Sequence, residues 1–318
     1  MVDGCLVVYK PKGITSHDVI NKIRRVYKIK KCGHAGTLDP MAQGVLLVFF
    51  GKALKLINFI PGEHLDKTYL ARLTLGSTTD SYDETGNITS VFEGKTDYSD
   101  DVLNKAINKY IGKYEQVPPV YSAIKVQGKK AYAMARAGEE VKLAARPVEV
   151  NSIRLIDDYI NNQKHNLLIR VHCSRGTYIR SLAHDIGQEL GCGAYLSYLL
   201  RERVGKWNSS HAFPYWKLEK GISFLKDNAF TKLEDVLSFP KIIVKQDALF
   251  KINNGQTITK REILDIEVTN QEVTSIFQIL SPEKKLIAVY TNNKPNNNSL
   301  DEEFRLFPLR VFHENETD

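Results

Sequence analysis

A glycine-rich loop holds the residues of this chain best suited to chemistry. It runs from Gly33 to Gly44, reads GHAGTLDPMAQG and lies just ahead of an apolar stretch. Its glycines let the backbone approach a ligand closely, and Asp39 could stabilise positive charge or take up a proton. The loop matches no phosphate-loop or dinucleotide pattern and lacks the zinc-deaminase signature. Taken alone, Asp39 before Pro40 is more typical of a turn residue than of a catalyst.

Short apolar segments predict the strands that position this loop. Thr68 to Leu75 alternates, so that Tyr69 lies on its apolar face, whereas Val45 to Phe50 is continuously apolar. A capping-box pattern, Thr15 with Asp18, predicts the start of a helix. The further strands expected are Cys5–Tyr9 and Asn166–Cys173, and the further helices expected are Asp101–Ile111 and Tyr178–Leu190.

Composition indicates a globular protein with a polyanionic partner. The 318 residues are 42% hydrophobic, enough for more than one domain, and the formal net charge is +7. Such an excess of Lys and Arg favours contact with phosphates, although many basic proteins bind no nucleic acid. The four cysteines form no CxxC pair, and no run approaches the about 20 apolar residues of a membrane span. We therefore expect a soluble, cytoplasmic protein with reduced thiols.

Two regions depart from this pattern. Between Tyr114 and Arg146, lysines and arginines interleave with tyrosines and apolar residues, which indicates a basic, partly helical arm. After about Phe239 the chain turns to short β-like segments, including Leu286 to Tyr290 and Phe304 to Phe312, separated by the polar loop Asn292–Ser299. This shift predicts a small all-β terminal domain.

Five motifs, in order along about residues 5–205, resemble those of the TruB pseudouridine synthases. The glycine loop is similar to the family's catalytic motif GHxGxLDPxAxG at every defined position. The other four matches are Lys10–Asp18 (KPKGITSHD), Lys67–Gly76 (KTYLARLTLG), Pro118–Tyr132 (PPVYSAIKVQGKKAY) and Cys173–Arg180 (CSRGTYIR).

The resemblance implies a role for each motif. Asp39 would be the catalytic aspartate, Tyr69 would stack on the target base, and Tyr178 and Arg180 would be its active-site companions. Leu199 would add an apolar wall. The complete set of implied substrate-binding residues is Lys10, His34, Tyr69, Lys129, Lys130 and Leu199.

The implied reaction suits these residue types. Breaking the N1–C1′ bond of uridine and rejoining the base through C5 oxidises nothing and releases no group, so no cofactor and no metal are expected. A carboxylate at position 39 could trap an electron-poor C1′ or remove a sugar proton, and both routes stay open. The uridine would be flipped out of a folded tRNA loop, the TΨC arm, which is recognised mainly by its shape.

One segment departs from the family pattern. The family commonly reads LRRTRxG where this chain has Leu199 to Gly205, so that Leu200 and Glu202 replace arginine and threonine. The change removes one positive charge and adds a negative charge that we expect near the site. It puts in doubt phosphate contacts by this segment, and leaves the chemistry at Asp39 unaffected.

The expected fold is α+β, with a mixed, largely antiparallel sheet flanked by helices. We expect a catalytic domain over residues 1–238 with a basic thumb insertion at about 126–147, a PUA-like RNA-binding domain over 239–318, and a monomer. The main alternative is a non-catalytic protein that binds structured RNA. A glycoside hydrolase normally needs two carboxylates, and no second acidic residue is expected in the glycine loop or beside Arg180.

Overall fold

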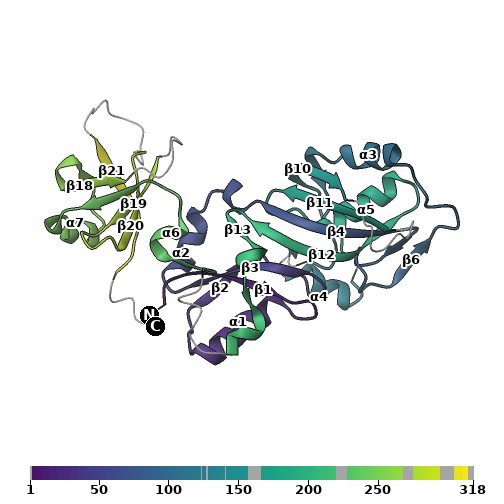
Figure 1. Ribbon diagram of the computed structural model, residues 1–318, viewed down its shortest axis with the longest axis horizontal. Helices are drawn as coiled ribbons and strands as arrows, with labels where there is room; N and C mark the ends of the chain where they lie inside the picture. The colour runs from purple at the N-terminus through teal and green to yellow at the C-terminus, as the bar shows by residue number, and fades with distance from the viewer. Residues whose placement is uncertain are drawn as a thin grey trace.

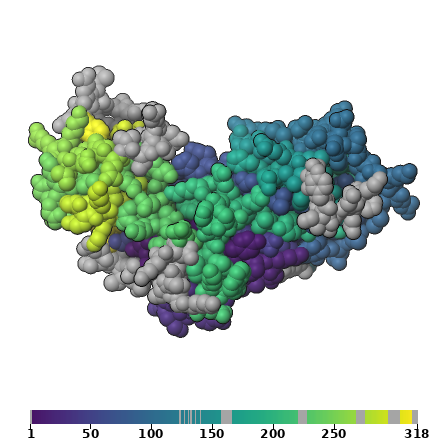
Figure 2. Space-filling view, in the orientation of Figure 1, coloured from purple at the N-terminus to yellow at the C-terminus, as the bar shows by residue number. Residues whose placement is uncertain are grey.

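Two β-sheets of unequal size dominate the molecule (Figure 1). The strands after residue 240 form a lobe at one end of an elongated body (Figure 2). The computed structural model describes residues 2–122, 124–126, 128–139, 141–156, 166–219, 228–267, 275–293 and 304–313.

The larger sheet is mixed and largely antiparallel, as expected. Among the described residues its main path runs β14-β1-β3-β12-β4-β11-β10-β7, and only the β1–β14 and β3–β12 pairs are parallel. Its strands are β1 (Gly4–Lys10), β2 (Cys32–Ala35), β3 (Gln43–Phe50), β4 (Lys67–Leu75), β7 (Gly112–Gln116), β10 (Arg146–Leu155), β11 (Asn166–Cys173), β12 (Ala194–Val204), β13 (Trp207–Asn208), β14 (Phe213–Pro214) and β15 (Phe230–Lys232).

Helices cover different parts of this sheet, with α1 against β1 to β3 and α3 and α5 over β4, β10 and β11 (Figure 1). Strand β3 is apolar throughout because Leu46, Val48 and Phe50 pack under α1 while Val45, Leu47 and Phe49 join a cluster on the other face. No helix within the described ranges is long and apolar enough to cross a membrane. The helices are α1 (Ser16–Tyr27), α2 (Ala53–Leu56), α3 (Asp100–Asn108), α4 (Ala131–Arg136), α5 (Ile179–Glu189), α6 (Leu233–Val236) and α7 (Leu249–Asn253).

Local sequence signals explain where the key helices begin and end. The capping box predicted at α1 is present, with Thr15 and Asp18 each bonding the other's backbone. Tyr178 is the N-cap of α5, within one residue of the predicted start. Helix α3 ends at Asn108, three residues before the predicted end, and Gly112 at φ 98° instead starts β7.

The thumb and the C-terminal lobe have the expected character. The thumb consists of a small hairpin followed by α4, and the lobe is a curled sheet with the short helix α7 beside it. The polar loop Asn292–Ser299 lies mostly outside the described residues. The remaining strands are β5 (Ser77–Thr79), β6 (Ile88–Val91), β8 (Lys125–Val126), β9 (Lys129–Lys130), β16 (Lys241–Val244), β17 (Ile258–Thr259), β18 (Ile263–Glu267), β19 (Ile276–Leu280), β20 (Leu286–Thr291) and β21 (Arg305–Val311).

Candidate active site

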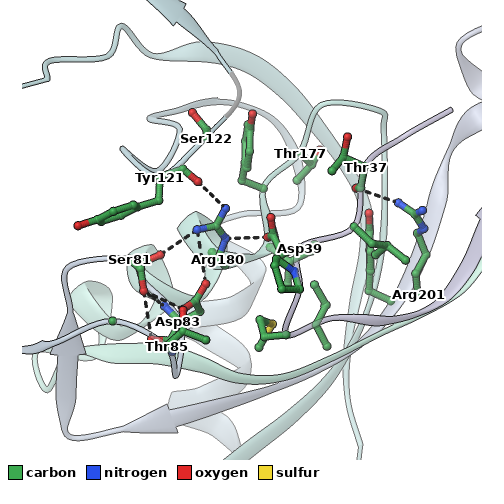
Figure 3. Close-up of a pocket in the computed structure, with 18 of the residues that line it drawn as sticks. Thr37, Asp39, Ser81, Asp83, Thr85, Tyr121, Ser122, Thr177, Arg180 and Arg201 are labelled. Carbon is green, nitrogen blue, oxygen red and sulfur yellow. Dashed lines mark hydrogen bonds and ion pairs between the residues drawn. The ribbon is translucent and has the colours of Figure 1, made fainter. Parts of the chain in front are cut away.

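A cavity of about 720 Å³ opens beside the glycine-rich loop, over the middle of the large sheet. Five residues predicted from sequence line it together, although they come from four separate segments. They are Asp39, Tyr69, Tyr178, Arg180 and Leu199. Figure 3 shows two of them, Asp39 and Arg180, pointing toward each other.

The start of α1 holds the loop that carries Asp39. The hydroxyl of Ser16, which is buried, accepts a hydrogen bond from the Leu38 N–H at 2.8 Å and donates to the Leu38 carbonyl at 3.1 Å. The Gly13 N–H donates to the Pro40 carbonyl at 2.8 Å. The backbone is therefore fixed on both sides of Asp39 by the segment that the KPKGITSHD motif supplies.

Arg180 orients the Asp39 carboxylate. Its Nε lies 2.9 Å from Asp39 Oδ2, and the two remaining nitrogens donate to the carbonyls of Ser81 at 3.1 Å and Tyr121 at 3.0 Å (Figure 3). The guanidinium is almost fully buried, whereas the Asp39 side chain is 36% exposed. Asp39 is thus held by a buried partner yet open to the cavity, as a group that meets a substrate must be.

A second carboxylate also lies beside Arg180, so the expectation of none there was wrong. Asp83 Oδ2 is 3.5 Å from the Arg180 guanidinium, and the side chain is buried. Its Oδ1 accepts from the Ser81 hydroxyl at 2.7 Å and from the N–H and hydroxyl of Thr85 at 2.9 and 2.6 Å. The sequence did not indicate this contact because the loop after β5 reaches α5 only through the tertiary fold.

Strand register supplies the floor of the cavity. Arg201 on β12 pairs with Tyr69 on β4, and Leu199 pairs with Ala71, so Tyr69, Leu199 and Arg201 share one face. Burial raises the pKa of the Tyr69 hydroxyl to about 12. Arg201 is fully buried and donates to the carbonyls of Val45 at 2.7 Å and Gly36 at 2.9 Å. In the sequence, Arg201 matches an arginine of the family pattern LRRTRxG, but it was not predicted as a site residue.

Gln116, at the end of β7, positions Tyr178. Its side-chain amide donates to the Tyr178 carbonyl at 3.0 Å and accepts from the Tyr178 N–H at 2.8 Å. Gln116 is buried, which makes this two-bond contact rigid. Burial also raises the pKa of the Tyr178 hydroxyl. Sequence reasoning missed Gln116, because a lone glutamine carries no pattern.

Two family models match this chain over most of its length. The model described as "TruB family pseudouridylate synthase (N terminal domain)" matches residues 24–179, and that for the tRNA pseudouridylate synthase B C-terminal domain matches residues 180–239. Among curated relatives, tRNA pseudouridine synthase B of Dehalococcoides mccartyi is 40% identical over 89% of this chain and 93% of the relative. The Syntrophomonas wolfei protein of the same name is 38% identical over 98% and 99%.

The chain belongs to the TruB family of pseudouridine synthases. It is therefore an enzyme that isomerises uridine to pseudouridine in tRNA. The fold is also similar to solved structures at lower identity: a Cbf5-Nop10-Gar1 complex (TM-score 0.67, 24% identity, 98% of this chain and 85% of that chain) and an H/ACA ribonucleoprotein bound to a substrate RNA (0.68, 23%, 98% and 86%). These two likenesses support the fold alone.

Two residues that the TruB resemblance implied as RNA contacts do not line the cavity. Lys10 is fully buried and donates to the carbonyls of Pro11 at 2.9 Å and Ile14 at 2.7 Å. Burial lowers its pKa to about 8. His34 lies on β2, where burial and the nearby charge of Arg201 lower its pKa. In this arrangement Lys10 stabilises the opening motif of the fold.

Lys129, the predicted thumb lysine whose side chain is described, does not line the cavity. Lys129 is exposed on β9, with its Nζ 3.6 Å from Glu139 Oε1. The backbone of Lys130 pairs with Lys125, and its side chain is outside the described part of the chain. Their role in RNA binding stays a prediction.

Glu202 does not place a negative charge at the site, contrary to expectation. It forms a two-bond ion pair with Arg170 on β11, at 2.9 and 3.2 Å. Glu202 does not line the cavity, whereas Leu199 and Arg201 do. The negative charge of Glu202 is therefore balanced by Arg170 on β11, the second strand along the sheet from β12, rather than by the catalytic loop.

Proposed function

We propose that this enzyme modifies the uridine at position 55, in the TΨC loop of tRNA, with Asp39 as the carboxylate that acts on the sugar. The observation that carries this proposal is the Asp39–Arg180 ion pair, which presents an oriented, partly exposed carboxylate to the cavity. Trapping C1′ and removing a sugar proton both require a carboxylate at this point, so either route fits the proposal.

The cavity walls suit a flipped uracil. Tyr69 offers an aromatic face and Leu199 an apolar wall, and stacking on them offsets part of the cost of unstacking the base, a few kcal/mol. Tyr178 lines the cavity with Asp39 and Arg180, where it would remove the proton at C5 or pack against the base. Isomerisation exchanges one bond for another within the nucleoside, so these side chains supply the chemistry without a cofactor.

The rest of the molecule would hold the tRNA stem-loop. The thumb, about residues 126–147, contributes Lys129 and Lys130 to phosphates. His34 would occupy the space that the flipped nucleotide leaves. We further propose a division into a catalytic domain, 1–238, and an RNA-binding PUA-like domain, 239–318, and a monomer in solution.

The substitution Asp39→Asn tests the assignment. Asparagine keeps the size and the turn geometry before Pro40 but removes the charge, so we expect turnover to be lost while tRNA affinity and the melting temperature stay near wild type. Chemical mapping of pseudouridine in an unmodified tRNA transcript is the readout, and wild type should convert position 55 alone. Residual activity within tenfold of wild type, only about 1.4 kcal/mol, would contradict the role of Asp39. RNA binding without conversion by wild type would favour a non-catalytic RNA-binding protein.

A further inference from the structure

Lys67 is a buried cation without a partner at the edge of the cavity. Its side chain is 9% exposed and lines the cavity wall. It makes no hydrogen bond or ion pair with any residue in the described ranges. Burial, together with the neighbouring charge of Arg201, lowers the Lys67 pKa to about 8, although the Asp66 carboxylate acts in the opposite direction.

The fold brings a second cation to the same place. Lys67 and Tyr69 share one face of β4, and Arg201 pairs with Tyr69 from β12. A Cβ added to Gly36 would lie 3.4 Å from Lys67 Cε and 3.5 Å from an Arg201 terminal nitrogen. Gly36 thus lies within contact distance of both side chains, and a Cβ at this position would touch each of them. Arg201 donates to the backbone carbonyls of Val45, Thr37 and Gly36 and forms no ion pair with a carboxylate within the described residues. The carboxylate that acts on Lys67 is that of Asp66, the preceding residue.

Negatively charged and positively charged side chains line different parts of the cavity. Asp39 and Asp83 face Arg180 at one end, whereas Arg201 and Thr37 lie on the other side of Asp39 (Figure 3). Arg180 thus has two carboxylates beside it, and Asp80 also lines the cavity. Lys67 and Arg201 add two cations to the lining, whereas Asp66, the carboxylate that acts on Lys67, does not line the cavity. An anion from the substrate would pair with these two cations, and phosphate is the anion that RNA brings.

We propose that Lys67, with Arg201 behind it, binds a backbone phosphate flanking the flipped uridine. This contact rests on the proposed function, because it requires the base to lie over Tyr69 and Leu199 with its sugar at Asp39. Lys67 is then a substrate-binding residue that fixes the backbone of the target nucleotide while the base is detached. Arg201 is a positioning residue, since its nitrogens already donate to the loop carbonyls.

A chemical double-mutant cycle tests the contact. Synthetic TΨC stem-loops carry a neutral methylphosphonate in place of one phosphate, either 5′ or 3′ of the target uridine. Single-turnover rates against enzyme concentration give the half-saturating concentration separately from the maximal rate. For wild type, we expect one of the two substitutions to raise the half-saturating concentration about tenfold. On the unmodified stem-loop, the half-saturating concentration of Lys67→Met should be about tenfold higher than that of wild type. On the modified stem-loop, this concentration should rise by less than a further threefold.

Controls separate the possible failures. Lys67→Arg keeps the charge and should retain the methylphosphonate effect, and Lys95→Met, at an exposed position, should behave as wild type. Equal losses for wild type and Lys67→Met, or no methylphosphonate effect on wild type, would overturn the proposal. If Lys67→Met fails to fold, the absence of a methylphosphonate effect on wild type still overturns the proposal. Absence of pseudouridine in the unmodified stem-loop with wild type would instead count against the proposed function.

Discussion

At the scale of single residues, the site is organised around one buried guanidinium. Arg180 has Asp39 on one side and Asp83 on the other, and its remaining donors reach the carbonyls of Ser81 and Tyr121. A charge held in this way cannot turn away from the cavity. The direction of the Asp39 carboxylate therefore depends on residues from outside the loop that carries it.

We predict that Asp83→Asn lowers kcat about 10- to 100-fold and changes tRNA affinity less than about twofold. Asparagine keeps the size of the side chain, but it removes one of the two charges that hold Arg180, and removing one partner from a buried pair is costly. Rates at saturating tRNA give kcat, and a binding isotherm gives the tRNA affinity, so the two effects are measured separately. Asp235→Asn, at an exposed carboxylate paired with Lys241, is the matched control. A kcat within threefold of wild type would show that the carbonyl contacts alone position Arg180.

The limits of sequence reasoning are visible in these residues. Asp39, Tyr69 and Arg180 lie in motifs with fixed spacing, so the resemblance predicted that they would share a cavity. Asp83 lies between the short strands β5 and β6, in a polar stretch typical of a turn, and Gln116 belongs to no motif. Their roles depend on long-range packing, which no local pattern encodes.

At the scale of elements, helix α5 begins at the site residues Tyr178 and Arg180 and also carries Asp185, a largely buried carboxyl group. Burial raises the pKa of Asp185 from 3.8 to about 6, so between these values the folded chain binds more protons than the unfolded chain. Stability therefore falls as pH rises through this window, and the loss remains above pH 6. After a discount for partial exposure, it amounts to about 1 kcal/mol.

Asp185→Asn should therefore raise the melting temperature at pH 8 by about 2–4 °C and change it little at pH 4. Thermal unfolding followed by circular dichroism from pH 4 to pH 8 measures the effect. Glu93→Gln, which removes an exposed carboxylate, should leave the pH profile as in wild type. An identical pH profile for Asp185→Asn and wild type would mean that Asp185 is solvated in both states.

Substitutions in the thumb hairpin test whether this element contacts tRNA. Replacing Lys129 and Lys130 by alanine should weaken tRNA binding and reduce the slope of log affinity against log salt by about 0.9 for each phosphate that is no longer neutralised. The side chain of Lys129 is exposed and its pair with Glu139 is long, so the folded state should keep most of its stability. Alanines at the exposed Lys105 and Lys113 form the control. A slope equal to wild type would show that the thumb lysines only aid solubility.

Element prediction succeeded where periodicity was clear and failed where it was not. The alternation in β4, the capping box of α1 and the apolar periodicity of α5 placed those elements within one or two residues. Strand β12 was not predicted, although it pairs with both β3 and β4 at the centre of the sheet. Its sequence, AYLSYLLRERV, has a buried arginine and two register shifts, which interrupt the alternating pattern.

At the scale of the whole molecule, the two sheets are joined by a common core. One apolar cluster contains Phe49 and Trp207 of the large sheet together with Leu286 and Phe312 of the C-terminal lobe, and α6 residues complete it. The sequence predicted a boundary near residue 239 from a change in composition. Composition carries no information about packing across a boundary, so this coupling could not be predicted.

The shared cluster should make the molecule unfold as one unit. We predict a single calorimetric transition for the full chain, and we expect Phe312→Ala to split it, with the C-terminal lobe unfolding first. Phe312 is 2% exposed, and truncating a buried phenylalanine costs about 3–5 kcal/mol. Phe250→Ala removes the same atoms from the same lobe at a side chain that is 75% exposed, so it should leave one transition. Two separate transitions in wild type would mean that the cluster stabilises the contact between the sheets too little for them to unfold together. The lobe would then be an independent domain.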